Sequence, residues 1–178
     1  FYFHVSSAWV GFVAFFVVFL YSIFYLIAKD RRYDVIAFSS AEIGVIFLTL
    51  VLITGPLWGR PIWGTWWTWD SRLTTTLILW LIYLAYLMLR SYATEGAQRA
   101  KMAAVVGIIG FLDVPLIHLS VEWWRTMHPK PVVMNFKSGV GKGLPPEKLI
   151  TLLVSLLAFT LLYCFLLIQR VKLESLKD

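Results

Sequence analysis

Tryptophan is concentrated in one stretch of the sequence. The segment WGRPIWGTWWTWDSRLT, residues 58–74, holds five of the nine tryptophans, and Trp123 and Trp124 form a pair in a later segment. Tryptophan also gathers at membrane–water interfaces as an aromatic belt, which is the alternative interpretation of these residues. A belt, however, distributes single aromatic side chains around the perimeter of a protein. Five tryptophans in one short stretch favour a platform for a large planar ligand.

The three histidines are the candidate metal ligands. A neutral imidazole binds iron well, and two imidazoles on opposite faces of a porphyrin fill both axial positions. A single histidine at a helix end is more often hydrogen-bonded or solvated than a ligand. For His118, which is flanked by Ile117 and Leu119, we favour a packing or hydrogen-bonding role. His4 and His128 are the natural pair of ligands if the fold places them at the same membrane surface.

The composition indicates which elements must position these side chains. The chain of 178 residues is 60% apolar, 17% aromatic and only 15% charged, which leaves too little polar surface for a soluble globule. A helix needs about 20 apolar residues to cross a hydrocarbon core of about 30 Å. We therefore predict an all-α, polytopic membrane helical bundle that forms a single domain, residues 1–178. Its five membrane-spanning helices are expected near Val5–Ala28, Val35–Leu57, Leu73–Leu89, Met102–Leu119 and Leu149–Ile168.

The polar segments between the apolar runs predict an orientation. The segments after the first, third and fifth runs lie on one side and hold nine of the sixteen Lys and Arg residues, so we expect this side to be cytoplasmic. The N-terminus, a tryptophan-rich loop at 58–72 and a second loop at 120–148 then share the opposite, non-cytoplasmic side. His4, His128 and the tryptophans are thereby predicted to be neighbours.

Several common chemistries have no signature in the sequence. Cys164 is the single cysteine, so there is no CxxC pair and no CxxCH haem-attachment site. Neither a Walker A sequence nor a GxGxxG sequence is present. The net charge of +6 fits a membrane protein with basic cytoplasmic loops. The expected environment is therefore a lipid bilayer, and we expect no nucleic acid as a partner.

The motif WGTWWTWDSRLT resembles the WWD signature of the haem-handling membrane proteins of cytochrome c maturation. The blocks FYFHVSSAW, TGPLWGRPIWGTWW and DVPLIHLSVEWWRTMHP are similar to the corresponding blocks of the CcmC family. The match runs in order from Phe1 to about Pro129. Related synthase-type proteins typically continue with Pro-Lys-Glu after their WD, whereas this sequence continues with SRLT. The family has six helices, so we expect a sixth, N-terminal helix before Phe1.

The resemblance implies a function. Family members bind haem b at the periplasmic face of the bacterial inner membrane and promote its covalent attachment to the haem chaperone CcmE. They work beside the ABC transporter subunits CcmA and CcmB and the small membrane protein CcmD. The family's axial ligands fall on His4 and His128, while His118 matches a neighbouring position that is not the usual ligand. Whether such a protein is an enzyme stays open. We expect a haem-presenting protein without a catalytic nucleophile of its own.

Haem also needs partners for its polar edge. Its faces suit aromatic side chains, and its propionates need cations, which Arg60, Arg72 or Arg125 could supply. Asp70 is placed to cap the helix that begins near Arg72, a role compatible with haem binding. The expected haem-binding residues are His4, His128, Trp58, Trp63, Trp66, Trp67, Trp69, Asp70, Arg72, Trp123, Trp124, Arg60 and Arg125.

Two alternative functions belong to other classes. A membrane exporter subunit for haem or another small molecule would carry ionisable groups or broken helices near the midplane, and Asp113 and Pro115 are the strong candidates for such features. A b-type electron-transfer subunit would hold a haem between histidines on two facing helices. Here one histidine of the favoured pair, His128, falls in a predicted loop.

Overall fold

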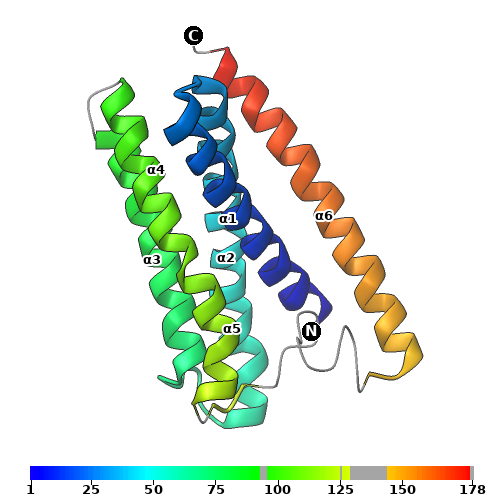
Figure 1. Ribbon diagram of the computed structural model, residues 1–178. Helices are drawn as coiled ribbons and strands as arrows, with labels where there is room; N and C mark the ends of the chain where they lie inside the picture. Colours follow the sequence, from blue (N-terminus) through cyan, green and yellow to red (C-terminus); the bar gives the residue numbers. More distant parts are fainter. Residues whose placement is uncertain (93–95, 125, 129–143, 177–178) are drawn as a thin grey trace.

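The computed structural model describes residues 1–92, 96–124, 126–128 and 144–176, and most of these residues are helical (Figure 1). No strand occurs in the described ranges, which confirms the all-α prediction. The helices are α1 (Tyr2–Ala28), α2 (Arg31–Trp63), α3 (Ser71–Tyr92), α4 (Ala97–Phe111), α5 (Asp113–Trp123) and α6 (Pro146–Ser175).

Five helical segments of the described chain are long and apolar enough to cross a membrane. Four of them are α1, α2, α3 and α6, and the fifth joins α4 to α5 as Ala97–Val121. The chain is therefore a polytopic helical membrane protein, as predicted. Most helices extend beyond the predicted apolar runs; α2, for example, begins at Arg31 and ends at Trp63 instead of Val35 and Leu57.

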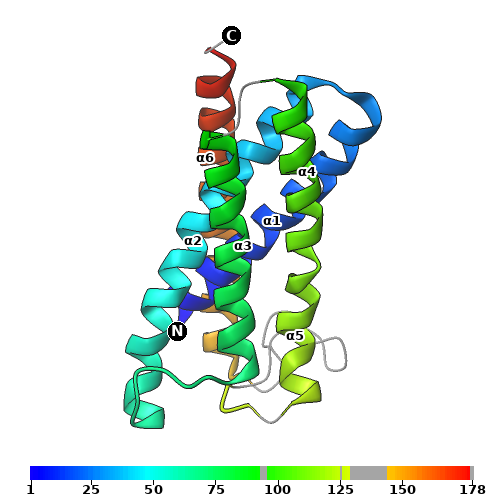
Figure 2. The same ribbon diagram turned by 90° about the vertical axis from the view of Figure 1, so that its left-hand side faces the viewer.

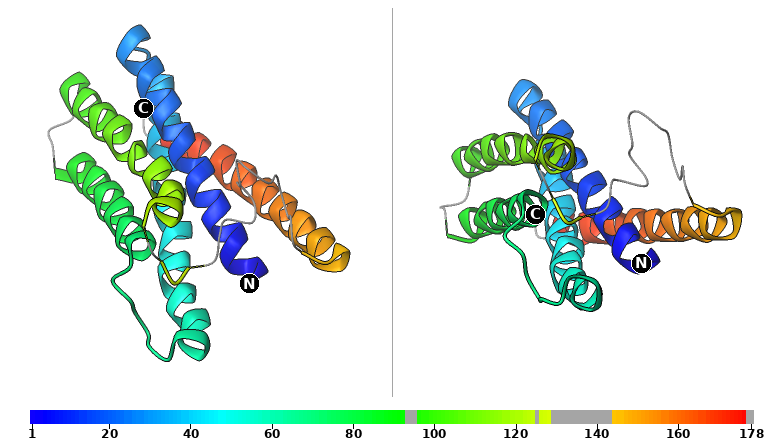
Figure 3. Two further views of the ribbon diagram at one scale, coloured as in Figure 1. Left: turned by 60° about the horizontal axis from the view of Figure 1, so that its bottom comes forward. Right: turned by 90° about the horizontal axis from the view of Figure 1, so that it is seen from below.

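The arrangement of the helices brings three distant segments to one end of the bundle. α1 packs against α2, α4 and α6, while α3 packs against α4, α5 and α2. The N-terminus, the end of α2, the start of α3 and the end of α5 all lie at the bottom of Figure 1, which we call the lower end (Figures 1 and 2). The last turn of α6 lies at the opposite end (Figure 1). Viewed from below, α6 extends away from the other helices (Figure 3). The predicted proximity is thus confirmed for the described residues of the three segments.

Small residues allow the central helices to approach closely. A side chain added at Gly44 would begin 2.6 Å from the ring of Phe15, and one at Gly107 would begin 2.9 Å from Val18. Such close backbone approach is typical of membrane helix interfaces. The ring of Phe15 stacks on Tyr83 at 3.7 Å between centroids. This buried core fixes α1 against α2, α3 and α4, and so positions the residues at the lower end of α1.

The fourth predicted helix is interrupted. α4 ends at Phe111 and α5 begins at Asp113, with Leu112 between them. Pro115 lacks the N–H that would bond to the carbonyl of Phe111, which explains a break at this level. The N–H of Leu112 instead donates to Ile109 O at 3.1 Å, a tighter turn than that of an α-helix.

Both predicted loops are shorter than expected. α2 continues through Trp63, so the loop predicted at 58–72 is non-helical only at residues 64–70. Pro56 and Pro61 are tolerated within α2, and Gly64 ends it with a φ of 73° while its N–H donates to Arg60 O. The second loop, predicted at 120–148, loses residues to α5 and α6, and its residues 125 and 129–143 lie outside the described part.

Candidate functional site

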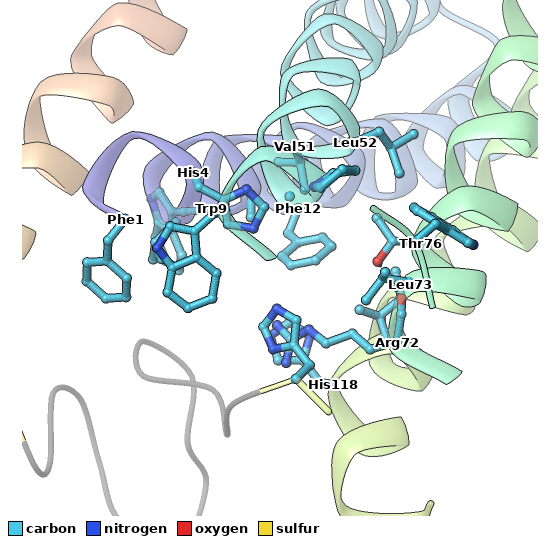
Figure 4. A pocket seen from close by; sticks show the side chains of 18 of the residues that line it. Phe1, His4, Trp9, Phe12, Val51, Leu52, Arg72, Leu73, Thr76 and His118 are labelled. Atoms are coloured by element: carbon cyan, nitrogen blue, oxygen red, sulfur yellow. Dashed lines mark hydrogen bonds between the residues drawn. The ribbon is translucent and has the colours of Figure 1, made fainter. Parts of the chain in front are cut away.

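A pocket at the lower end is lined by side chains from α1, α2, α3, α5 and the segment after α5 (Figure 4). The empty space among its lining residues is about 1210 Å³, including the part open to solvent. Most of the lining is apolar or aromatic with a few polar groups, as is usual for sites that bind small molecules and cofactors. The predicted site residues that line this pocket are His4, His128, Trp58, Trp63, Trp67 and Arg72.

His4 projects into the pocket from the first turn of α1 (Figure 4). Its Nδ1 lies 2.8 Å from Thr54 Oγ1 of α2. Residues 4, 5, 8, 9 and 12 of α1 all line the pocket, and residues three and four positions apart lie side by side on a helix, so Trp9 and Phe12 belong to the same broad face as His4. The N-terminal part of α1 thus contributes one imidazole and two large aromatic rings to the same wall.

The two other histidines also line the pocket. The ring of His128 lies 6.4 Å from that of Trp63, and its backbone N–H donates to Thr126 Oγ1 at 3.1 Å. His118 lies deeper on α5, where its Nδ1 is 3.3 Å from Val114 O and its ring contacts Phe12 edge-on at 5.1 Å. His118 therefore has the packing and hydrogen-bonding contacts predicted for it, and it is also part of the pocket wall.

Asp70 connects two of the segments that form the site. Its Oδ1 accepts a hydrogen bond from the N–H of Leu73 at 3.0 Å, which confirms the predicted cap at the start of α3. Its Oδ2 accepts from Thr126 Oγ1 at 2.9 Å. Thr126 in turn accepts a hydrogen bond from the N–H of His128. Asp70 therefore links the start of α3 to the segment 126–128, which carries His128.

The predicted arginines differ in their surroundings. Arg72 lines the pocket, and its buried Nη1 has no hydrogen-bonding partner within the described ranges. Its guanidinium is therefore a cation available to an anionic ligand. Arg60 instead stacks on the ring of Trp66, with 4.3 Å between its Cζ and the ring centroid. Arg125, the third predicted cation, lies outside the described residues.

The structure divides the predicted aromatic platform into two sets. Trp58, Trp63 and Trp67 line the pocket. The second set lies outside the pocket lining and is exposed, up to 77% for Trp69. Trp67 and Trp69 remain in edge-on contact at 5.7 Å, so the two sets meet there. The exposed set comprises Trp66, Trp69, Trp123 and Trp124.

Sequence reasoning overlooked several residues of the site. Trp9 and Phe12 could have been found, because positions 4, 5, 8, 9 and 12 follow the period of a helix face. Thr54 and Thr126 carry no such signal. Each is a small polar residue whose importance depends on a partner from another segment, His4 for Thr54 and Asp70 for Thr126.

Comparisons with known proteins identify relatives of the chain. The protein family described as Heme exporter protein C matches residues 1–178. A Heme exporter protein C of Bradyrhizobium diazoefficiens is 39% identical over 174 residues, which are 98% of this chain and 65% of that protein. A putative cytochrome c biosynthesis ccmC-like mitochondrial protein of Marchantia polymorpha is 34% identical over 139 residues, 78% of this chain and 58% of the relative.

A third relative is more distant. The Heme exporter protein C of Escherichia coli strain K12 is 33% identical over 132 residues, which cover 74% of this chain and 51% of that protein. The chain thus spans between about half and two thirds of the length of these curated relatives.

Proposed function

The chain belongs to the CcmC family of heme exporter proteins, and from this membership we propose that it binds haem in the lower-end pocket and delivers it to the chaperone CcmE for cytochrome c maturation. The observation that carries the proposal is the composition of the pocket wall. Two predicted iron ligands, three of the predicted tryptophans and Arg72, whose buried Nη1 lacks a hydrogen-bonding partner among the described residues, line the same space. These groups match the metal, the flat faces and the acidic edge of haem.

In this proposal His4 and His128 are the axial ligands of the haem iron. They are far apart in the sequence but line one pocket, and a neutral imidazole from each would complete the coordination of the iron. Two such ligands would keep the iron six-coordinate and away from oxygen. Delivery of the haem therefore requires that one of them be lost or exchanged.

The aromatic side chains are proposed to hold the faces of the macrocycle. Trp58, Trp63 and Trp67 line the pocket together with Trp9 and Phe12 of α1. The exposed set, Trp66, Trp69, Trp123 and Trp124, is proposed to continue this surface at the opening. There it would contact the haem edge or the incoming chaperone.

Arg72 is proposed to bind a haem propionate. Leaving the buried Nη1 of Arg72 without a hydrogen bond is costly, and a carboxylate is the ligand that offsets this cost best. Arg60 and Arg125 are the further candidates for the second propionate. Arg60 is held near the exposed tryptophans by its contact with Trp66.

The chain is proposed to present haem and to leave the attachment chemistry to the haem and the chaperone. The described residues of the pocket wall include no cysteine, lysine or carboxylate that could serve as a nucleophile or general acid. What they can supply is orientation, which makes the reaction with the chaperone effectively intramolecular. The cargo is proposed to be haem b, which has free vinyl groups.

The proposed setting follows from the family and the charge pattern. We place the chain in the bacterial inner membrane with the lower end on the periplasmic side, since the opposite end carries the denser basic segments. Its proposed partners, besides CcmE and the lipid bilayer, are the ABC transporter subunits CcmA and CcmB and the small membrane protein CcmD.

The experiment that tests this function measures binding and delivery in one host. The chain is expressed with CcmE in a bacterium that lacks its own CcmC, and haem is measured both in the purified chain and as the covalent CcmE adduct. We expect a haem-containing chain, and an adduct that forms only when the chain is present. A colourless chain would favour a transport role, and a chain whose haem never transfers would favour electron transfer.

A further inference from the structure

Thr54 of α2 makes the contact that fixes the ring of His4. Oγ1 of Thr54 lies 2.8 Å from His4 Nδ1, across 50 positions of sequence. The next residue, Gly55, lies beside the same ring, since a side chain added there would begin 3.5 Å from His4 Cε1. The edge of the imidazole from Nδ1 to Cε1 is therefore seated on residues 54 and 55 of α2. The second ring nitrogen, Nε2, is the one that takes no part in this contact with Thr54.

The hydroxyl of Thr54 has one hydrogen, and its position determines the direction of this bond. Oγ1 lies 2.7 Å from the carbonyl oxygen of Leu50, one turn earlier in α2. A carbonyl oxygen only accepts, so the hydroxyl hydrogen points to Leu50. The oxygen of Thr54 then offers only lone pairs to His4. Consequently Nδ1 of His4 is the donor and carries the proton.

Two other threonines of the bundle show the same arrangement with partners that can only donate. Trp80 Nε1 donates to Thr49 Oγ1 at 2.8 Å, and Trp9 Nε1 donates to Thr160 Oγ1 at 3.0 Å. Both threonines also donate to the carbonyl four residues earlier, each at 2.7 Å. An indole nitrogen has no lone pair to offer, so a threonine in this geometry acts as an acceptor. Thr54 repeats the geometry with a histidine.

We propose that Thr54 is a positioning residue that holds neutral His4 as the Nδ1–H tautomer and presents the Nε2 lone pair to the pocket. In metal sites, a histidine ligand usually donates its second ring N–H to an oxygen, which fixes the tautomer and the ring orientation. The consequence for iron binding rests on the proposed function. The tautomer of His4 does not, because it follows from contacts within the chain.

The direct test of the tautomer uses the protein in lipid bilayers without haem. The protein is labelled with ¹⁵N at its three histidines, and nitrogen chemical shifts report which ring nitrogen is protonated. The His4 signals are identified by their loss in His4→Gln. We expect a protonated Nδ1 and an unprotonated Nε2 for His4 in the wild type and in Thr54→Ser, and a mixture of tautomers in Thr54→Val. A wild-type His4 protonated at Nε2 would overturn the proposal.

Haem affinity gives a second readout with a matched control. Thr54→Val is expected to lower the affinity for added haem by about 10-fold, the lower bound for losing such a supporting bond, and Thr54→Ser is expected to restore it. Thr49→Val removes the same kind of bond from Trp80, which does not line the pocket, and is expected to bind haem like the wild type. Equal affinity in Thr54→Val and Thr49→Val would overturn the proposed role. Failure of the wild type to bind haem would overturn the proposed function instead, and the nitrogen shifts would still decide the tautomer.

Discussion

Asp70 links the start of α3 to the segment that carries His128. One carboxylate oxygen accepts from the backbone of Leu73 and the other accepts from Thr126. The acidic residue of the WDSRLT motif therefore has two local tasks. It caps a helix, and it restrains the segment that carries His128.

Replacing Asp70 tests whether its two hydrogen bonds matter for haem binding without unfolding the bundle. Asp70→Ala loses a cap worth about 1 kcal/mol and a second hydrogen bond worth roughly 0.5–1.5 kcal/mol. We expect the bundle to remain folded, with haem retention after purification reduced several-fold because His128 is less restrained. Retention is measured as bound haem per protein from the absorption spectrum.

The matched control for this variant lies at the other end of the bundle. Asp30 caps α2 by accepting from the N–H of Arg32 at 2.9 Å. Asp30→Ala also loses an N-cap, but it does so away from the pocket, so we expect normal haem retention. An equal loss in both variants would show that Asp70 acts only through helix stability.

At the scale of elements, the last two turns of α2 and the turn after it present tryptophans in two directions. Trp58 and Trp63 lie on the helix and line the pocket, whereas Trp66 and Trp69 lie in the turn and are exposed. The end of α2 is thus a wall of the pocket as well as the start of a loop.

The two sets of tryptophans can be compared directly. Each stacked aromatic ring contributes roughly 0.5–1.5 kcal/mol beyond the burial of its area, so losing three rings from the pocket should be severe. We expect the triple change of Trp58, Trp63 and Trp67 to Ala to abolish haem retention. The triple change of Trp66, Trp69 and Trp124 to Ala should retain most of the haem. Equal retention in the two triple variants would indicate that the tryptophans form only an interfacial belt.

The elements also show what could be predicted from the sequence. Long apolar runs predicted the membrane-spanning helices, because the thickness of a bilayer sets their length. Counting the crossings between segments then predicted that His4, His128 and Trp63 would be neighbours. The end of α2 was missed because Pro56 and Pro61 are typical of loops. In a helix each proline removes only one backbone hydrogen bond. The break at Leu112 was missed because the apolar run continues through it.

Two contacts at the site had no signal in the sequence. Thr54 looks like any small polar residue in an apolar helix, and only the packing of α1 on α2 gives it His4 as a partner. Thr126 similarly gains its meaning from Asp70. Such contacts depend on how helices rotate and approach each other, which hydrophobic periodicity does not determine.

At the scale of the whole molecule, the two ends of the bundle have different characters. The upper end in Figure 1 is held by charged pairs, such as the buried Arg90 with Asp34 and the more exposed Arg170 with Glu42. The lower end is aromatic and contains the pocket with all three histidines. This asymmetry fits the proposed binding of one ligand at one end of the bundle.

The axial ligation of the proposed haem is the central claim, and the spin state of the purified protein tests it most directly. Absorption and electron paramagnetic resonance spectra are recorded for the wild type and for His4→Ala, His128→Ala and His118→Ala, each loaded with haem in lipid bilayers. We predict a low-spin, six-coordinate iron in the wild type and in His118→Ala, and a high-spin iron or loss of haem in His4→Ala and His128→Ala. A low-spin spectrum that survives in His4→Ala but disappears in His118→Ala would contradict axial ligation by His4 and His128.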